Sequence, residues 1–191
     1  FSGEKIKNYH IGFDLILAFL SRISTIPPSV LYFQIIPIIL SIGIGILTYK
    51  LVLVWTNSQS SSIWSVFFVY FGGSFGWVVS YFRDRSLGGE SMFWMQQSIS
   101  ALVNPPFAIS IVFLLTGLIL LWELLKEPGK KLLIIPIILV WGPLIEFKVY
   151  AGLLLLAGLG VVALQGLIRK GDWLCLKVFA ASVKKLYIPS K

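Results

Sequence analysis

The groups that could do chemistry in this sequence gather in one polar segment, residues 83–106, which interrupts an otherwise hydrophobic chain. Its two carboxylates, Asp84 and Glu90, are of the type that acts as a general base toward an acceptor hydroxyl, so they are the candidate catalytic residues. The alternative is a solvated connection between two helices, because loops are polar by default. The other candidates in this segment, which could bind a substrate through charge or hydrogen bonds, are Arg83, Arg85, Gln97 and Asn104.

Two smaller polar groups could contribute to the same binding surface. His10 lies close in sequence to Asp14, and Glu146 lies close to Lys148. A cationic side chain near the membrane surface can hold a lipid-linked phosphate by charge-assisted hydrogen bonds. All four are therefore candidate substrate-binding residues. The alternatives are an ordinary interfacial polar residue for His10 and a hairpin tip or ion pair for Glu146 with Lys148.

The sequence predicts no metal site and no disulfide bond. His10 is the only histidine and Cys175 the only cysteine, so these residues cannot form a histidine and cysteine ligand cluster. We expect Cys175 to be a small apolar packing residue. No cofactor is predicted, although the carboxylates leave a role for a divalent cation open.

The composition places these groups in a membrane protein. Hydrophobic residues make up 57% of the 191 residues, charged residues make up 13%, and the mean hydropathy is +0.89; charged residues are about 25% of a typical soluble domain. Several apolar segments approach the roughly 20 residues that a helix needs to cross the hydrocarbon core. An open sheet would leave unpaired backbone groups in lipid, so we expect an all-α, polytopic transmembrane helical bundle.

We expect a single membrane domain over residues 1–191, with about five spans and short amphipathic interfacial helices. The sequence starts at Phe1 rather than at a methionine, which suggests a fragment of a longer chain. The polar segment 83–106 should be the main outer loop, and a shorter loop is expected at residues 56–62. The predicted spans are residues 31–49, 63–82, 107–125, 132–145 and 149–168.

Two parts of this layout carry specific expectations. Residues 11–24 should form a short amphipathic helix that ends before Pro27 and Pro28. Residues 132–168 would be about 55 Å long as one helix, so they should fold back as a hairpin, with the turn starting at Gly142. Glu146 and Lys148 then lie at its tip. The apolar residues at helical spacing in the first helix are Ile11, Leu15, Ala18, Phe19 and Ile23.

The charge distribution predicts which ends of the spans face the cytoplasm, where basic loops are retained. One side of the five-span layout carries ten basic and three acidic residues, and the other carries six basic and five acidic residues. Residues 83–106 belong to the less basic side, so we expect them outside the cytoplasmic membrane. Residues 126–131 and 169–191 should lie inside. Topology explains the basic excess, and no nucleic-acid partner is predicted.

The segment YHIGFDLILAFLSRISTIPPSVLYFQIIPIIL, residues 9–40, resembles the part of GT-C superfamily multi-pass glycosyltransferases that follows their first outer loop. Gly-Glu-Ser at 89–91, Gln-Ser at 97–98 and Asn-Pro-Pro at 104–106 also resemble one outer loop of uncharacterised bacterial membrane proteins. Together these resemblances cover roughly residues 9–165.

The resemblance implies an inverting transferase that takes a sugar from a polyprenyl-phosphate donor on the outer side of the membrane. The usual catalytic aspartate of the superfamily lies upstream of the segment matched by His10. Asp84 and Glu90 are therefore candidates by position rather than by motif. The partners that the resemblance implies are membrane lipid and a polyprenyl-phosphate-linked sugar, and protein partners stay undetermined.

Two other functional classes remain open. A transporter or flippase would place charged or unwound polar elements near the middle of the bilayer, whereas the predicted spans are almost free of interior charge. A non-catalytic assembly subunit would use the polar loop as a docking surface, and would need no outer acidic residue for activity.

Overall fold

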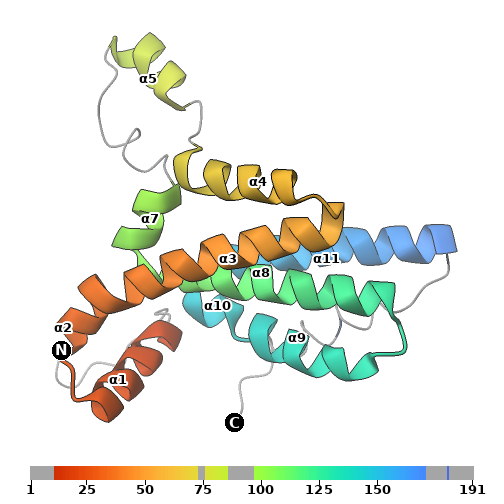
Figure 1. The fold of residues 1–191 in the computed structure, drawn as a ribbon, viewed down its shortest axis with the longest axis horizontal. Helices are drawn as coiled ribbons and strands as arrows, with labels where there is room; N and C mark the ends of the chain where they lie inside the picture. Colours follow the sequence, from red (N-terminus) through yellow and green to blue (C-terminus); the bar gives the residue numbers. More distant parts are fainter. Residues whose placement is uncertain (1–10, 73–75, 86–96, 171–179, 181–191) are drawn as a thin grey trace.

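The computed structural model describes residues 11–72, 76–85, 97–170 and 180, and within them every regular element is a helix. The all-α prediction is therefore confirmed for these parts of the chain. The elements, labelled in Figure 1 where there is room, are α1 (Gly12–Ser24), α2 (Pro28–Val30), the π-helical η1 (Leu31–Ile35), α3 (Ile36–Thr56), α4 (Gln59–Phe71), α5 (Gly76–Asp84), α7 (Gln97–Val103), α8 (Pro105–Lys126), the 3-10 turn η2 (Lys131–Leu133), α9 (Ile134–Trp141), α10 (Leu144–Phe147) and α11 (Val149–Lys170).

Among the residues that the structure describes, two helices are long and apolar enough to cross a membrane. One is the continuous helix Pro28–Thr56, made of α2, η1 and α3, and the other is α8. They contain the spans expected at residues 31–49 and 107–125. The apolar part of α11, Val149–Gln165, is shorter. Two such helices are compatible with membrane association.

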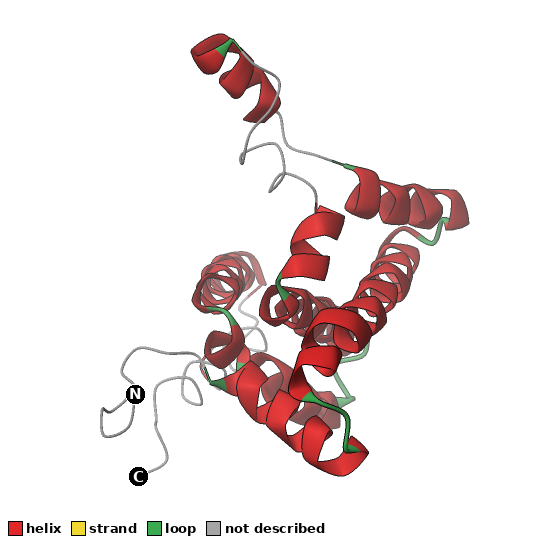
Figure 2. Ribbon diagram, turned by 90° about the vertical axis from the view of Figure 1, so that its left-hand side faces the viewer, coloured by secondary structure: helices red, strands yellow, loops and turns green. Residues whose placement is uncertain are grey.

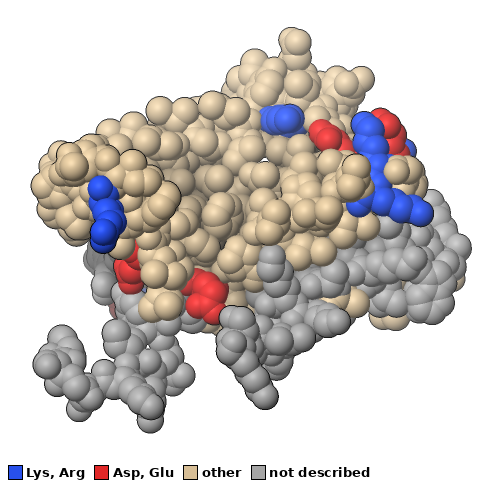
Figure 3. All heavy atoms as spheres, turned by 90° about the horizontal axis from the view of Figure 1, so that it is seen from below, with Lys and Arg blue, Asp and Glu red and all other residues tan. Residues whose placement is uncertain are grey.

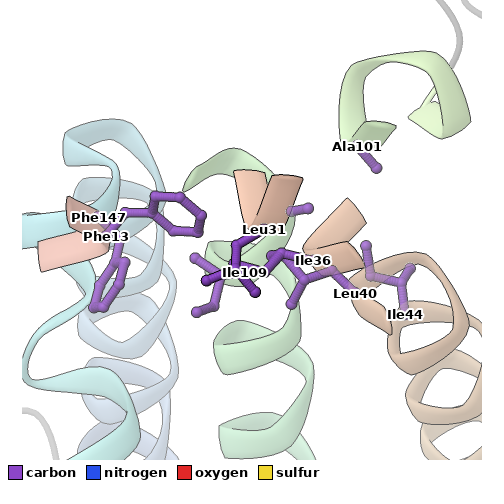
Figure 4. Close-up of a cluster of buried hydrophobic side chains, with 9 residues drawn as sticks. Phe13, Leu31, Ile36, Leu40, Ile44, Ala101, Ile109 and Phe147 are labelled. Atoms are coloured by element: carbon purple, nitrogen blue, oxygen red, sulfur yellow. The ribbon is translucent and has the colours of Figure 1, made fainter. Parts of the chain in front are cut away.

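Helices α3 and α8 lie side by side and run in the same direction (Figure 1). Near their ends, Lys126 Nζ donates a hydrogen bond to the carbonyl oxygen of Val54 (3.4 Å), and the rings of Trp55 and Trp122 meet edge-on at 6.5 Å. Their beginnings meet in a buried cluster, shown in Figure 4, that also holds residues of α1, α7 and α10. The labelled members are Phe13, Leu31, Ile36, Leu40, Ile44, Ala101, Ile109 and Phe147.

Helix α9 packs against α8, and the closest approach is at Trp141. The side chain of Trp141 is fully buried, and a Cβ atom on Gly117 would lie only 2.0 Å from its indole nitrogen. The indole nitrogen donates a hydrogen bond to the carbonyl oxygen of Leu114 (3.4 Å). Glycine at position 117 therefore allows the large ring to reach the α8 backbone. Trp141 belongs to a second buried cluster, which also contains Leu155 and Leu159 of α11.

The hairpin prediction for residues 132–168 is confirmed. Helix α9 ends at Trp141, Gly142 and Pro143 form a turn, and α11 then runs back in the opposite direction (Figure 1). The fourth expected span, residues 132–145, is not one long helix, because α9 has only 8 residues and is followed by the separate turn of α10.

The second expected span, residues 63–82, is divided. Helix α4 ends at Phe71, Gly72 takes an extended conformation, and α5 begins at Gly76. A Cβ atom on Gly72 would lie 2.2 Å from the carbonyl oxygen of Phe68. Gly72 is thus the residue that ends the helix. Glycine costs about 1 kcal/mol relative to alanine inside a helix, which favours a break here.

Two expected loops contain helices. Residues 59–62 belong to α4, whose N-terminus is capped by Ser58, because its hydroxyl accepts a hydrogen bond from the Ser61 N–H. In the polar segment 83–106, residues 97–103 form α7. Serine-rich sequence was a sign of a helix cap here rather than of a loop.

Helix α1 forms where expected, but its buried face is not the stripe read from the sequence. Phe13 is 2% exposed and packs edge-on against Tyr32, whereas Leu15, Phe19 and Ile23 are 61%, 64% and 67% exposed. Ile16 and Leu17 are partly buried against the same cluster as Phe13. The helix has two apolar faces, and the expected stripe points outward.

Candidate functional site

One end of the bundle brings together helix α1, helix α10 and the beginning of α8. Gly12, in the first turn of α1, lies so close to α10 that a Cβ atom there would be 3.0 Å from the Glu146 carbonyl oxygen. Phe13 and Phe147 enter the buried cluster from the same two helices (Figure 4). The hydrophobic contact therefore places Asp14 of α1 and Glu146 of α10 at the same end of the bundle.

The charged groups at this end are open to their surroundings. Asp14 and Glu146 are exposed. Lys148 is the extended residue between α10 and α11. It is half-buried, and its Nζ lies 5.2 Å from the centre of the Tyr150 ring. A cation in this position is attracted by the ring face. Among the described residues Lys148 has no ion-pair partner, so the ion pair considered for Glu146 with Lys148 does not form.

Asn104 has a structural role in addition to its predicted binding role. Its side-chain oxygen accepts a hydrogen bond from the Phe107 N–H (3.3 Å) at the start of α8. Pro105 and Pro106 follow it at the first helical positions, where proline is well tolerated because those N–H groups have no partner in the helix. Asn104 is thus the N-cap of α8.

Arg83 and Asp84 are occupied with each other at the end of α5. The arginine donates two hydrogen bonds of 2.9 Å to the two carboxylate oxygens. The side-chain hydrogen bond from Arg83 lowers the pKa of Asp84, and the same bond raises the pKa of Arg83. A carboxylate with a lowered pKa is a weaker base, which reduces the suitability of Asp84 as a general base. Arg85 follows in the left-handed region at φ 53°.

The structure brings together only part of the predicted site. Helix α5, with Arg83 and Asp84, stands apart from the bundle in both Figure 1 and Figure 2, so these residues are not gathered with Glu146 and Lys148. Gln97 begins α7. His10 and Glu90 lie outside the described residues.

Charged side chains gather toward the two ends of the face shown in Figure 3, with a broad uncharged band between them. No group of three or more His, Cys, Asp and Glu side chains that could hold a metal ion occurs in the described part of the chain. The distribution of charge along this face is suited to binding a charged group at an end of the bundle and an apolar group along its sides.

No family model, curated protein or solved structure matches this chain.

Sequence reasoning missed Tyr150, which lies two residues after Lys148 and whose ring faces the lysine ammonium group. It also missed the apolar hollows between α8 and α11, which begin beside this tyrosine. An aromatic residue two positions after a basic residue at a helix start was the available signal, since tyrosine is enriched where one end of a side chain is apolar and the other is wet.

Proposed function

We propose that this chain is part of an integral membrane glycosyltransferase that transfers a sugar from a polyprenyl-phosphate donor on the outer face of the cytoplasmic membrane. The observation that carries the proposal is the gathering, at one end of an apolar bundle, of two exposed carboxylates and an ammonium group that has no ion-pair partner among the described residues. These groups are Asp14, Glu146 and Lys148.

The proposed roles follow from the charges. Lys148 holds the donor phosphate, because its ammonium group has no competing carboxylate among the described residues. A carboxylate serves as the general base toward the acceptor hydroxyl. Glu90 takes this role in preference to Asp84, whose oxygens accept both hydrogen bonds from Arg83. Asp14 and Glu146 contact the sugar or the acceptor.

Conservative substitutions in the full-length protein test these roles. Removal of a general base commonly lowers a rate by about 10²- to 10⁴-fold, so Glu90→Gln should abolish most transfer of a labelled sugar from the polyprenyl-phosphate donor. Glu127→Gln is the matched control. The Glu127 side chain is 64% accessible, and its carboxylate pairs with Lys130. It should transfer at the parental rate.

Glu90→Gln and Asp84→Asn together decide whether segment 83–106 takes part in chemistry. If both variants insert normally and transfer sugar at the parental rate, the segment is scaffolding and the proposed roles are wrong. Glu146→Gln and Lys148→Gln then show separately whether the other polar end binds substrate, because they should raise KM for the donor or acceptor rather than abolish kcat.

A transporter or flippase is the second candidate, and the division between α4 and α5 is the observation that favours it. Discontinuous helices commonly form transporter binding sites near the middle of the bilayer. Purified protein in sealed vesicles separates the two functions. A transporter moves a labelled lipid-linked sugar between leaflets without an acceptor, whereas a transferase releases the label only when an acceptor is present.

A further inference from the structure

A continuous apolar groove runs between helices α8 and α11. It consists of two hollows of about 130 and 270 Å³ that share Leu114 and Leu154 as lining residues. One hollow begins at Tyr150 and the other reaches Val162. The groove opens sideways, because the side chains of Tyr150, Leu154 and Val162 on its wall are 58%, 72% and 42% exposed.

The interior of the groove suits a hydrocarbon chain. Ser110 lines the first hollow, but its hydroxyl donates to the carbonyl oxygen of Phe107 in its own helix (2.7 Å) and is therefore satisfied. Gly158 lines the second hollow, and a Cβ atom built on it would have no atom within 4 Å. An apolar occupant can thus lie against both helices without displacing a side chain.

One end of the groove carries a positive charge. The Lys148 ammonium group lies 5.2 Å from the centre of the Tyr150 ring, and Tyr150 lines the groove. No ion pair neutralises Lys148 among the residues that the structure describes. An occupant that combines an apolar chain with an anionic head would therefore complement both the groove and its end.

The length of the groove matches one leaflet of a bilayer. Residues 150–162 of α11 span about 18 Å at the helical rise of 1.5 Å per residue, and half of a hydrocarbon core of about 30 Å is about 15 Å. With Lys148 at headgroup level, a chain lying in the groove would end near the middle of the bilayer.

We propose that the groove between α8 and α11 binds one acyl chain of an anionic phospholipid, whose phosphate contacts Lys148. The proposal relies on the membrane location in the proposed function and on none of its chemistry. In the absence of donor, Lys148 contacts the phospholipid phosphate at the position that the donor phosphate would take during transfer, so the lipid site exists whether or not the protein transfers sugar.

Native mass spectrometry of the full-length protein, released from vesicles of equal phosphatidylglycerol and phosphatidylcholine with identical acyl chains, tests the headgroup. The wild type should retain phosphatidylglycerol preferentially. Lys148→Gln should reduce this preference about fivefold, as expected for one basic residue near a membrane surface. Lys50→Gln removes the same charge from an exposed position on α3 and should leave the preference unchanged. Equal preferences in the two variants would overturn the phosphate contact.

Gly158→Leu tests the chain. The leucine side chain fills the groove from an open position, so the fold should persist. Retention of both phosphatidylglycerol and phosphatidylcholine should fall, because the acyl chain has lost its site. Ala157→Leu is the control, since Ala157 is an exposed residue of the same helix that does not line the groove. If Gly158→Leu retains as much lipid as Ala157→Leu, or if crosslinking shows a second copy of the protein over Gly158, the groove holds no acyl chain. The assay contains no sugar donor, so it is independent of the transferase test.

Discussion

At the scale of single residues, the chemistry of a carboxylate depends on neighbours that the sequence does not always reveal. Asp84 and Glu90 were both candidate catalytic residues in the sequence. The structure shows that both oxygens of Asp84 accept hydrogen bonds from the adjacent Arg83, whereas Glu90 lies outside the described residues. Neighbouring opposite charges are visible in the sequence, but the bidentate geometry is not, because it depends on the backbone at the end of α5.

The pairing leads to a prediction about the pKa of Asp84. Arg83→Gln removes the hydrogen bonds that lower this pKa, so the pKa should rise toward the usual aspartate value. Carbon-13 NMR of the labelled carboxyl group during an acid titration measures it. Any stability that the pair contributes is present above the pKa of the unfolded chain and is lost as the pH falls through the lowered folded value. An unchanged Asp84 pKa in Arg83→Gln would contradict the pairing, and Arg85→Gln is the control.

Asn104 shows how a structural residue can resemble a binding residue. It was a candidate because it is polar and lies in the outer segment, yet Asn followed by two prolines is also the signature of a helix start. We expect Asn104→Ala to destabilise the protein by about 1 kcal/mol through loss of the cap. Asn104→Asp keeps a cap oxygen and should be close to wild type in thermal unfolding in detergent. Equal losses in both variants would show that the amide group does more than cap α8.

At the scale of elements, helix existence was predictable and helix faces were not. The helical spacing of apolar residues in 11–24 predicts a helix, but so many positions are apolar that either of two faces could be the buried one. Phe13 is buried because it packs against Tyr32 and lies in the same buried cluster as Phe147 of α10, and both residues are distant in sequence. In lipid both faces of a helix can be apolar, so hydrophobicity alone does not choose the packed one.

Two glycine substitutions should have different effects on stability, because Gly117 lies in the contact between α8 and α9 whereas Gly158 of α11 faces open space. Gly117→Ala places a methyl group 2.0 Å from the Trp141 indole nitrogen, so it should destabilise the protein by about 1–3 kcal/mol, as overpacking does. Gly158→Ala enters open space and should be neutral or stabilising by up to about 1 kcal/mol. Thermal unfolding of both variants in the same detergent measures the difference. Equal effects would contradict the packing of Trp141 on α8.

At the scale of the whole molecule, composition predicts the helical class because lipid permits few alternatives. The length of the apolar segment 132–168 predicts its hairpin. The separation of α5 from the bundle was not predictable. It follows from the helix end at Gly72, and the sequence pattern there fits a continuous span equally well, since residues 63–82 carry no charge. In the described part of the chain, two helices are long and apolar enough to cross a membrane, where five spans were expected.

The orientation remains a prediction that labelling can test. In a Cys175→Ser background, a cysteine introduced at Ser86 should react with an impermeant thiol reagent in intact cells. A cysteine introduced at Lys130, in the basic turn after α8, should react only after permeabilisation. The positive-inside rule gives the sign of this result. The reverse pattern would invert the proposed topology and remove the outer segment from the outer face.

The short return through η2, α9 and α10 has a consequence for the membrane itself. These elements contain 3, 8 and 4 residues, and Gly142 and Pro143 connect α9 to α10. Even end to end, the elements and this turn extend about 27 Å at helical rises. A typical hydrocarbon core is about 30 Å thick. If this return crosses the bilayer, the lipids beside it must compress, and such hydrophobic mismatch favours residence in thin membranes. The protein should then unfold at a higher temperature in vesicles of short-chain lipids than in those of long-chain lipids, and should gather where the bilayer is thinnest.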